Sequence, residues 1–185
     1  MTRAVGAAIA AGCMAMTVAV VGAQTRAGAG APQPVSDAIR ASWKSAKTNI
    51  HDSAAKVPEN LYSFSPVPTV VRTFGQIVAH TAGANYEFCS AAKGEKSPKA
   101  ENAFEALATK VAIVKAYDDS VAYCDAVFAA LTDKSAVESV DQPFGAGKGP
   151  RLAALVGNIG HLNEHYGNLV TYMRIKGIVP PTSAK

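Results

Sequence analysis

Apolar residues recur at intervals of three and four along most of the chain after residue 35, which is the spacing of one face of an α-helix. No strand-like alternation persists, and no internal repeat is visible. The pattern predicts helices over about 36–56, 69–92, 104–131 and 150–176. Four amphipathic helices joined by loops of middling length favour an all-α fold, a four-helix bundle.

Residues typical of helix ends support these bounds. Ser36 is a natural N-cap with Asp37 in the first turn. The prolines of "VPENLYSFSPVP" end the first helix. Pro150 suits the first position of the last helix, and Gly177 suits the position just past its end.

The third helix has the longest apolar stripe, and a stripe of that length must pack against other helices. Its members are Phe104, Leu107, Val111, Val114, Tyr117, Val121, Cys124, Phe128 and Leu131.

Residues 1–23 have the layout of a secretory signal peptide: Arg3, then an uncharged run of small and apolar residues, ending in Val21-Gly22-Ala23. An uncleaved membrane anchor is the alternative, because the run is about long enough to span a bilayer. Its richness in alanine and glycine favours cleavage, which leaves no stable membrane span. We therefore expect a periplasmic or secreted protein, with 24–35 as a flexible linker, 36–181 as the bundle and 182–185 as a tail.

The net charge of the chain indicates which classes of binding partner fit it. Removal of residues 1–23 takes away Arg3 and no acid, so the net charge falls from +4 to +3. The basic residues are scattered, and so small an excess argues against nucleic-acid binding. A small-molecule substrate fits better, and the chain is expected to be a monomer or a homodimer.

The string "HLNEH", residues 161–165, places two of the four histidines of the chain one helical turn apart. Both rings can then reach one metal ion. The string also fits the H-x-x-E-H pattern of a zinc peptidase class. A helical wheel, however, puts Glu164 nearly opposite the apolar stripe, and no acid follows it to serve as a third ligand. We therefore reject a peptidase and expect Glu164 to be solvated.

A third ligand has to come from another helix, and His80 is the best candidate because it lies in the middle of the second helix among apolar residues. The alternative is that His80, His161 and His165 are ordinary histidines, hydrogen-bonded or half exposed. His51 is expected to be a surface residue or to contact a ligand without binding the ion itself.

Two stretches, "PENLYSFSPVPTVVRTFGQIVAHTAGANYEFC" and "GHLNEHYGNLVTYMRIKGIVPP", resemble the two signature regions of the DinB-like (damage-inducible) metalloprotein family. In that family one histidine of the second helix and an H-x-x-x-H pair of the fourth coordinate a divalent metal. The corresponding positions are His80, His161 and His165. Three imidazoles suit Zn²⁺ or Ni²⁺, with Fe²⁺ and Mn²⁺ as alternatives.

Some relatives transfer low-molecular-weight thiols or isomerise thiol adducts, so the resemblance implies a metal-dependent enzyme of the thiol-linked transferase or hydrolase type. The alternative is a non-catalytic metal-binding or interaction protein. A substrate cavity beside the metal would favour the enzyme, and we expect it to be lined by Asn85, Tyr86, Asn158 and Tyr172.

Cys89 and Cys124 form an even pair once the signal peptide is removed, which suggests a disulfide in an oxidising compartment. The residues alone leave two topologies open. A third helix that starts at Pro98 would form an antiparallel hairpin with the second and would put the two cysteines about 30 Å apart, too far for a bond. A crossover from about 91 to 105 would make the two helices parallel and bring the cysteines level. The family resemblance implies this second, up-down-down-up order.

Overall fold

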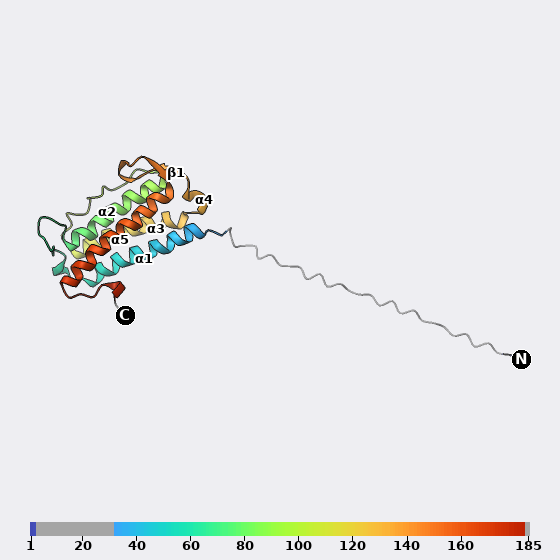
Figure 1. Ribbon diagram of the computed structural model, residues 1–185, viewed down its shortest axis with the longest axis horizontal. Coiled ribbons are helices and arrows are strands. Elements are labelled where there is room, and N and C mark those ends of the chain that lie inside the picture. The colour runs from blue at the N-terminus through green and yellow to red at the C-terminus, as the bar shows by residue number, and fades with distance from the viewer. Residues whose placement is uncertain (3–31, 184–185) are drawn as a thin grey trace. The chain divides into compact units, whose positions relative to one another are not determined.

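The computed structural model describes residues 1–2 and 32–183. Residues 3–23 of the predicted signal peptide, 24–31 of the predicted linker and 184–185 of the predicted tail lie outside the described residues. Four long helices pack side by side and confirm the predicted bundle (Figure 1). They are α1 (Pro34–Lys56), α2 (Phe74–Lys93), α3 (Lys110–Ala130) and α5 (Arg151–Ile175). The short elements are η1 (Glu59–Leu61), α4 (Asp133–Ala136), β1 (Ser139–Asp141), η2 (Pro143–Gly145), β2 (Lys148–Pro150) and η3 (Pro181–Ser183).

Side-chain bonds show that α2 and α3 run parallel. Asn85 Nδ2 donates to Ser120 Oγ at 3.0 Å, and further along both helices Ser90 Oγ lies 2.9 Å from the Tyr123 hydroxyl. The residue numbers rise together on the two helices, which is the register of parallel neighbours. A plain hairpin between α2 and α3 is thereby excluded.

α1 and α5 run antiparallel to α2 and α3. Trp43 Nε1 donates to Asp125 at 2.7 Å, whereas His51, later on α1, contacts Asp118, earlier on α3. α5 is antiparallel to α2, because its first residue bonds a backbone carbonyl near the end of α2. The order is therefore up-down-down-up, as the family resemblance implied. In the part of the chain that the structure describes, no helix has the length and apolar character needed to cross a bilayer.

The crossover between α2 and α3 covers residues 94–109. It extends further along the chain than expected, because the apolar stripe predicted that the third helix begins at about residue 104. Phe104 and Leu107 lie on this crossover, half-buried, and α3 begins only at Lys110. The side chain of Thr109 accepts a bond from Ala112 N at 3.3 Å and so caps the helix there. Val111, also assigned to the stripe, is exposed. Apolar spacing did not separate packed turns from helix in this segment.

The crossover lies directly on α2 at Gly83. A Cβ added to Gly83 would overlap the backbone carbonyl of Glu101. The missing side chain lets the two backbones touch. Further along, Phe104 packs against Tyr86 with ring centroids 6.1 Å apart. These contacts hold the crossover over the face of α2 that carries His80.

α2 also begins later than predicted, at Phe74 rather than near Thr69. Thr73 and Gln76 form a capping box: Thr73 Oγ1 accepts from Gln76 N at 3.2 Å, and Gln76 Oε1 accepts from Thr73 N at 2.9 Å. Val70, predicted to lie on the buried stripe, is exposed in the loop before the helix.

Other helix ends match the prediction in part. α1 starts at Pro34, and Ser36 is no N-cap but a buried residue whose hydroxyl donates to Asp133 of α4 at 2.6 Å. Pro150 stands one position before α5 instead of inside it. Gly177 follows the end of α5 with φ +70°, as predicted, because the left-handed backbone there suits a glycine.

The antiparallel hairpin of β1 and β2 was not predicted, since three-residue strands are too short to show an alternating pattern. The loop between the strands places Phe144 against Phe88 of α2, with ring centroids 5.2 Å apart.

The predicted disulfide between Cys89 and Cys124 is confirmed. Their Cα atoms lie 5.5 Å apart, and both residues are fully buried between α2 and α3. On the α1 side of the core, Trp43 stacks on Phe128 at 4.4 Å between ring centroids. Apolar packing and one covalent link therefore hold the helices in place.

Candidate metal centre

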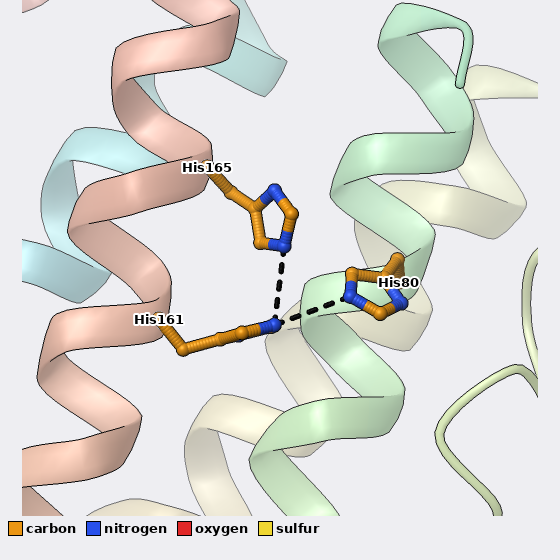
Figure 2. Close-up of side chains that lie close together, drawn as sticks. All are labelled: His80, His161 and His165. Carbon is orange, nitrogen blue, oxygen red and sulfur yellow. Dashed lines mark hydrogen bonds between the residues drawn. The ribbon is translucent and has the colours of Figure 1, made fainter. Parts of the chain in front are cut away.

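Three histidines from two helices converge in the bundle. Nε2 of His161 lies 3.2 Å from Nε2 of His80 and 3.1 Å from Nε2 of His165 (Figure 2). Together the three offer ligand atoms that all lie within 4.8 Å of one another. Two nitrogens that share one tetrahedral ion, each at about 2.0–2.1 Å, lie about 3.3 Å apart. The cluster could therefore hold a divalent ion.

The packing of the helices sets this convergence. His161 and His165 share one face of α5 because they are four residues apart. Antiparallel packing of α2 then brings His80 opposite them. His80 is only 4% exposed and His165 only 8%, whereas His161 is half-buried. Because the neighbouring apolar residues are buried in the core, the three rings are held in position before any ligand binds.

The outer ring nitrogens have different partners. His80 Nδ1 lies 3.1 Å from Glu105 Oε1, so an N–H at that position donates to the carboxylate and leaves the lone pair on Nε2. His165 Nδ1 lies 3.4 Å from the side-chain amide of Asn168. His161 Nδ1 is buried, and the described part of the chain offers it no hydrogen-bond partner.

The protein does not satisfy the inner nitrogens by itself. A neutral imidazole has one N–H, so His161 Nε2 can donate to only one of its two neighbours. With the His80 proton on Nδ1, its Nε2 presents a lone pair to the same small space. A cation that accepts all three lone pairs removes this conflict, so the residues present fit a divalent metal.

Burial keeps two of these rings neutral. Burial lowers the pKa of His161 to about 3, with repulsion from His165 and His80 adding to the shift. Burial also lowers the pKa of His165 to about 4, with His80 and Arg72 as further positive neighbours. Neutral imidazole is the form that binds a metal, so both rings are ready to do so at neutral pH.

Acidic residues surround His80. Besides Glu105, the Oε1 atom of Glu101 lies 3.5 Å from His80 Nε2. Glu105 also forms an ion pair with Arg72, whose Nη2 is 3.1 Å from its Oε1. Burial, and then the charge of Glu101, raises the pKa of Glu87. Arg72, Glu101 and Glu105 were not expected at the site from the sequence, because residues in loops carry no periodic signal.

A cavity of about 850 Å³ reaches the cluster at His165. The loop before α2 forms one wall, and the outer face of α5 forms another. Polar groups line much of it, including those of Ser65, Arg72, Gln76, Glu105, Asn168 and Tyr172.

The four residues expected to line a substrate pocket have different places. Tyr172 lines the cavity, and its hydroxyl donates to the backbone oxygen of Arg72 at 2.9 Å. Asn85 and Asn158 are fully buried beside the disulfide, and Tyr86 is half-buried against the crossover. These three residues lie on helix faces that turn toward α3 or the crossover, away from the cavity wall.

Glu164 and His51 remain outside the cluster. Glu164 is exposed and lies on the cavity wall. His51 Nδ1 lies 2.9 Å from Asp118 Oδ1 on the surface between α1 and α3.

A model of the DinB superfamily matches residues 42–169. The chain belongs to the DinB superfamily. The resemblance seen in the two signature stretches is thereby confirmed. No curated protein matches the chain.

Solved structures with this fold include a DinB-like protein from Bacillus cereus ATCC 10987, with a TM-score of 0.65 and 20% identity over 78% of this chain and 95% of the other. A conserved protein from Enterococcus faecalis has a TM-score of 0.61 and 16% identity over 76% of this chain and 96% of its own. A mycothiol-dependent maleylpyruvate isomerase has a TM-score of 0.59 and 17% identity over 72% of this chain, which spans 60% of the isomerase. At such identities the likeness shows a shared fold.

Proposed function

We propose that this DinB-superfamily protein is a divalent-metal-dependent enzyme that acts on a small molecule bound in the cavity beside His165. The observation that carries the proposal is the convergence of three histidine Nε2 atoms beside that cavity, which His165 lines. Zn²⁺ or Ni²⁺ suits three imidazoles best, and Fe²⁺ and Mn²⁺ are the alternatives.

The reaction class that we favour is thiol-linked transfer, and hydrolysis is the alternative. The support is the fold shared with an isomerase that depends on mycothiol, a small thiol. A divalent ion held by the three nitrogens supplies positive charge that favours deprotonation of a thiol or water bound to it.

The residues of the chain have distinct tasks in this proposal. His80, His161 and His165 hold the ion, and Glu105 fixes the proton of His80 on Nδ1. Arg72 offers N–H donors to polar or anionic groups of a substrate at the cavity wall. The tightly packed bundle behind the histidines excludes water from that side of the site.

We also propose that the protein works in the periplasm or outside the cell. The signal-peptide layout of residues 1–23 motivates this, and the buried Cys89–Cys124 disulfide supports it, because such bonds persist mainly in oxidising compartments.

A second candidate is a metal-binding protein without catalysis. The low exposure of His80 and His165 favours it, because an ion between these rings would be largely shielded from solvent. Closed sites of that kind serve structure or storage more often than catalysis.

The experiment compares zinc-loaded and chelator-treated protein in two assays. One follows hydrolysis of p-nitrophenyl acetate. The other follows the reaction of added free cysteine with 1-chloro-2,4-dinitrobenzene, in which the cysteine sulfur replaces chloride. We expect metal-dependent turnover in at least one assay, lost in His161→Ala and kept in His51→Ala, the control histidine paired with Asp118. Zinc binding without turnover in either assay would favour the second candidate. Absence of zinc binding would contradict both.

A further inference from the structure

The crossover brings a carboxylate to the inner side of the histidine cluster. Glu101 Oε1 lies 3.5 Å from His80 Nε2, the same nitrogen that faces His161. Carboxylate oxygens bind zinc-like ions at about 2.0–2.2 Å, close to the bond length of imidazole nitrogens. We infer that Glu101 is a fourth protein ligand of the divalent ion, an inference that rests on the proposed metal site.

The backbone of Glu101 is fixed where this role needs it. At Gly83, three residues after His80, the crossover touches α2 so closely that any side chain at Gly83 would overlap the Glu101 carbonyl. Residues three apart lie on neighbouring parts of one helix face. The crossover therefore presents the Glu101 side chain to the ring of His80 from a position that the fold determines.

The side chain of Glu101 can still move. It is 41% exposed, and its carboxylate does not belong to the group of ligand atoms that lie within 4.8 Å of one another. Ligation therefore requires the carboxylate to swing from its contact with His80 toward His161 and His165. A glutamate at the surface can make that movement by rotating its own side-chain torsions.

The local charge favours the movement. Glu105 is already neutralised by Arg72, whereas the ion-pair contact of Glu101 is to His80. Glu87 stands close enough for the charge of Glu101 to raise its pKa. The Glu101 carboxylate therefore lies beside the histidine cluster with only a histidine as its ion-pair contact, and a divalent ion would supply positive charge there.

A fourth protein ligand changes what the site can do. Sites with four protein ligands are closed, whereas catalytic sites keep one position open. Release of Glu101 would open a position, and its return would close it. The position of the Glu101 side chain would then determine whether the site is open, as catalysis requires, or closed, as in a non-catalytic metal-binding protein. A substrate would have to compete with the Glu101 carboxylate for the fourth position on the ion.

The test compares Glu101→Gln with Glu95→Gln, an exposed glutamate on the same crossover that pairs with Lys93 instead. The zinc Kd is measured by competition with a chelator, and the coordination is read from the visible spectrum of the Co²⁺-loaded protein. We expect Glu101→Gln to weaken zinc binding at least about 10-fold and to change the cobalt spectrum. Glu95→Gln should match the wild type in both.

Equal affinity and equal spectra for wild type and Glu101→Gln would overturn the inference while leaving the three-histidine site intact. Glu87→Gln separates ligation from simple charge. If it weakens zinc as much as Glu101→Gln does, and neither variant alters the cobalt spectrum, Glu101 acts only through its charge and the inference fails. A wild-type protein that binds no zinc would instead refute the metal site on which the inference rests.

Discussion

The disulfide and the histidine cluster both join α2 to a neighbouring helix, about 14 Å apart along α2 at 1.5 Å per residue. Cys89 and Cys124 are fully buried, and their covalent bond leaves no reactive group. His80 and His165 are also buried and His161 is half-buried, but the inner nitrogens of the three rings compete for too few protons. One link is complete without a ligand, and the other needs a cation to complete it.

Unpaired polar atoms alone do not distinguish the two regions. Near the disulfide, Asn85 and Asn158 each have a buried side-chain oxygen that lacks a hydrogen-bond partner within the described residues. Neutral amide oxygens and bonded sulfurs are poor ligands for zinc-like ions, whereas neutral imidazoles are good ones. The comparison therefore teaches that the type and direction of the donor atoms identify a metal site.

The largest effect should come from removing the disulfide. The double variant Cys89→Ala/Cys124→Ala should lose about 3–4 kcal/mol of unfolding free energy, because the unfolded chain gains the freedom of an open loop of this length. Zinc stoichiometry in the folded variant should stay unchanged. Urea unfolding followed by zinc titration checks both, and a folded double variant that binds no zinc would break the distinction between the two regions.

His161→Ala should weaken zinc binding by more than about 100-fold, beyond the 10–100-fold that is typical of changes next to ligands. The urea midpoint of the metal-free protein should change little, because the half-buried ring contributes little to the core. Chelator competition measures the affinity, with His51→Ala as the control. Wild-type affinity in His161→Ala would remove this histidine from the site.

Glu105→Ala should weaken zinc binding about 10-fold, since His80 loses the carboxylate that orients its ring. Glu138→Ala is the matched control, because Glu138 also pairs with an arginine, Arg151, but does so away from the cluster. If both variants bind zinc equally well, the contact between Glu105 and His80 has no role in the site.

The last prediction concerns the stability of the metal-free protein in acid. The folded pKa values of His161, about 3, and His165, about 4, lie below the value of about 6.5 expected in the unfolded chain. At pH values between the folded and the unfolded pKa, the unfolded state binds more protons than the folded state does. The stability of the metal-free protein should therefore fall as the pH drops below about 6.5. Urea unfolding at pH 7.5 and pH 4.5 should show a smaller fall for His165→Gln than for wild type, and equal falls would contradict the assignment.

Much of the fold could be predicted because it depends on local spacing. The stripes of α1 and α5 and the left-handed Gly177 follow from helical periodicity and capping chemistry. The i, i+4 pair at 161 and 165 is likewise a local signal. Predictions failed where apolar spacing continued past a helix end, as at Val70 and Phe104, because the caps at Thr73 and Thr109 decide those ends.

The acids around the site could not be predicted. Glu101 and Glu105 lie on a crossover whose path depends on contact with Gly83, a residue 18 positions from Glu101. Arg72 reaches the cluster through its pair with Glu105. Such placements depend on packing between distant segments, for which a single sequence gives no periodic pattern.

The most direct test is a crystal structure of zinc-loaded protein with anomalous data collected at the zinc edge. We predict one anomalous peak per chain, about 2.0–2.1 Å from Nε2 of His80, His161 and His165. An empty cluster in protein that carries zinc elsewhere, or a peak bound by only one of the three histidines, would contradict the three-histidine site.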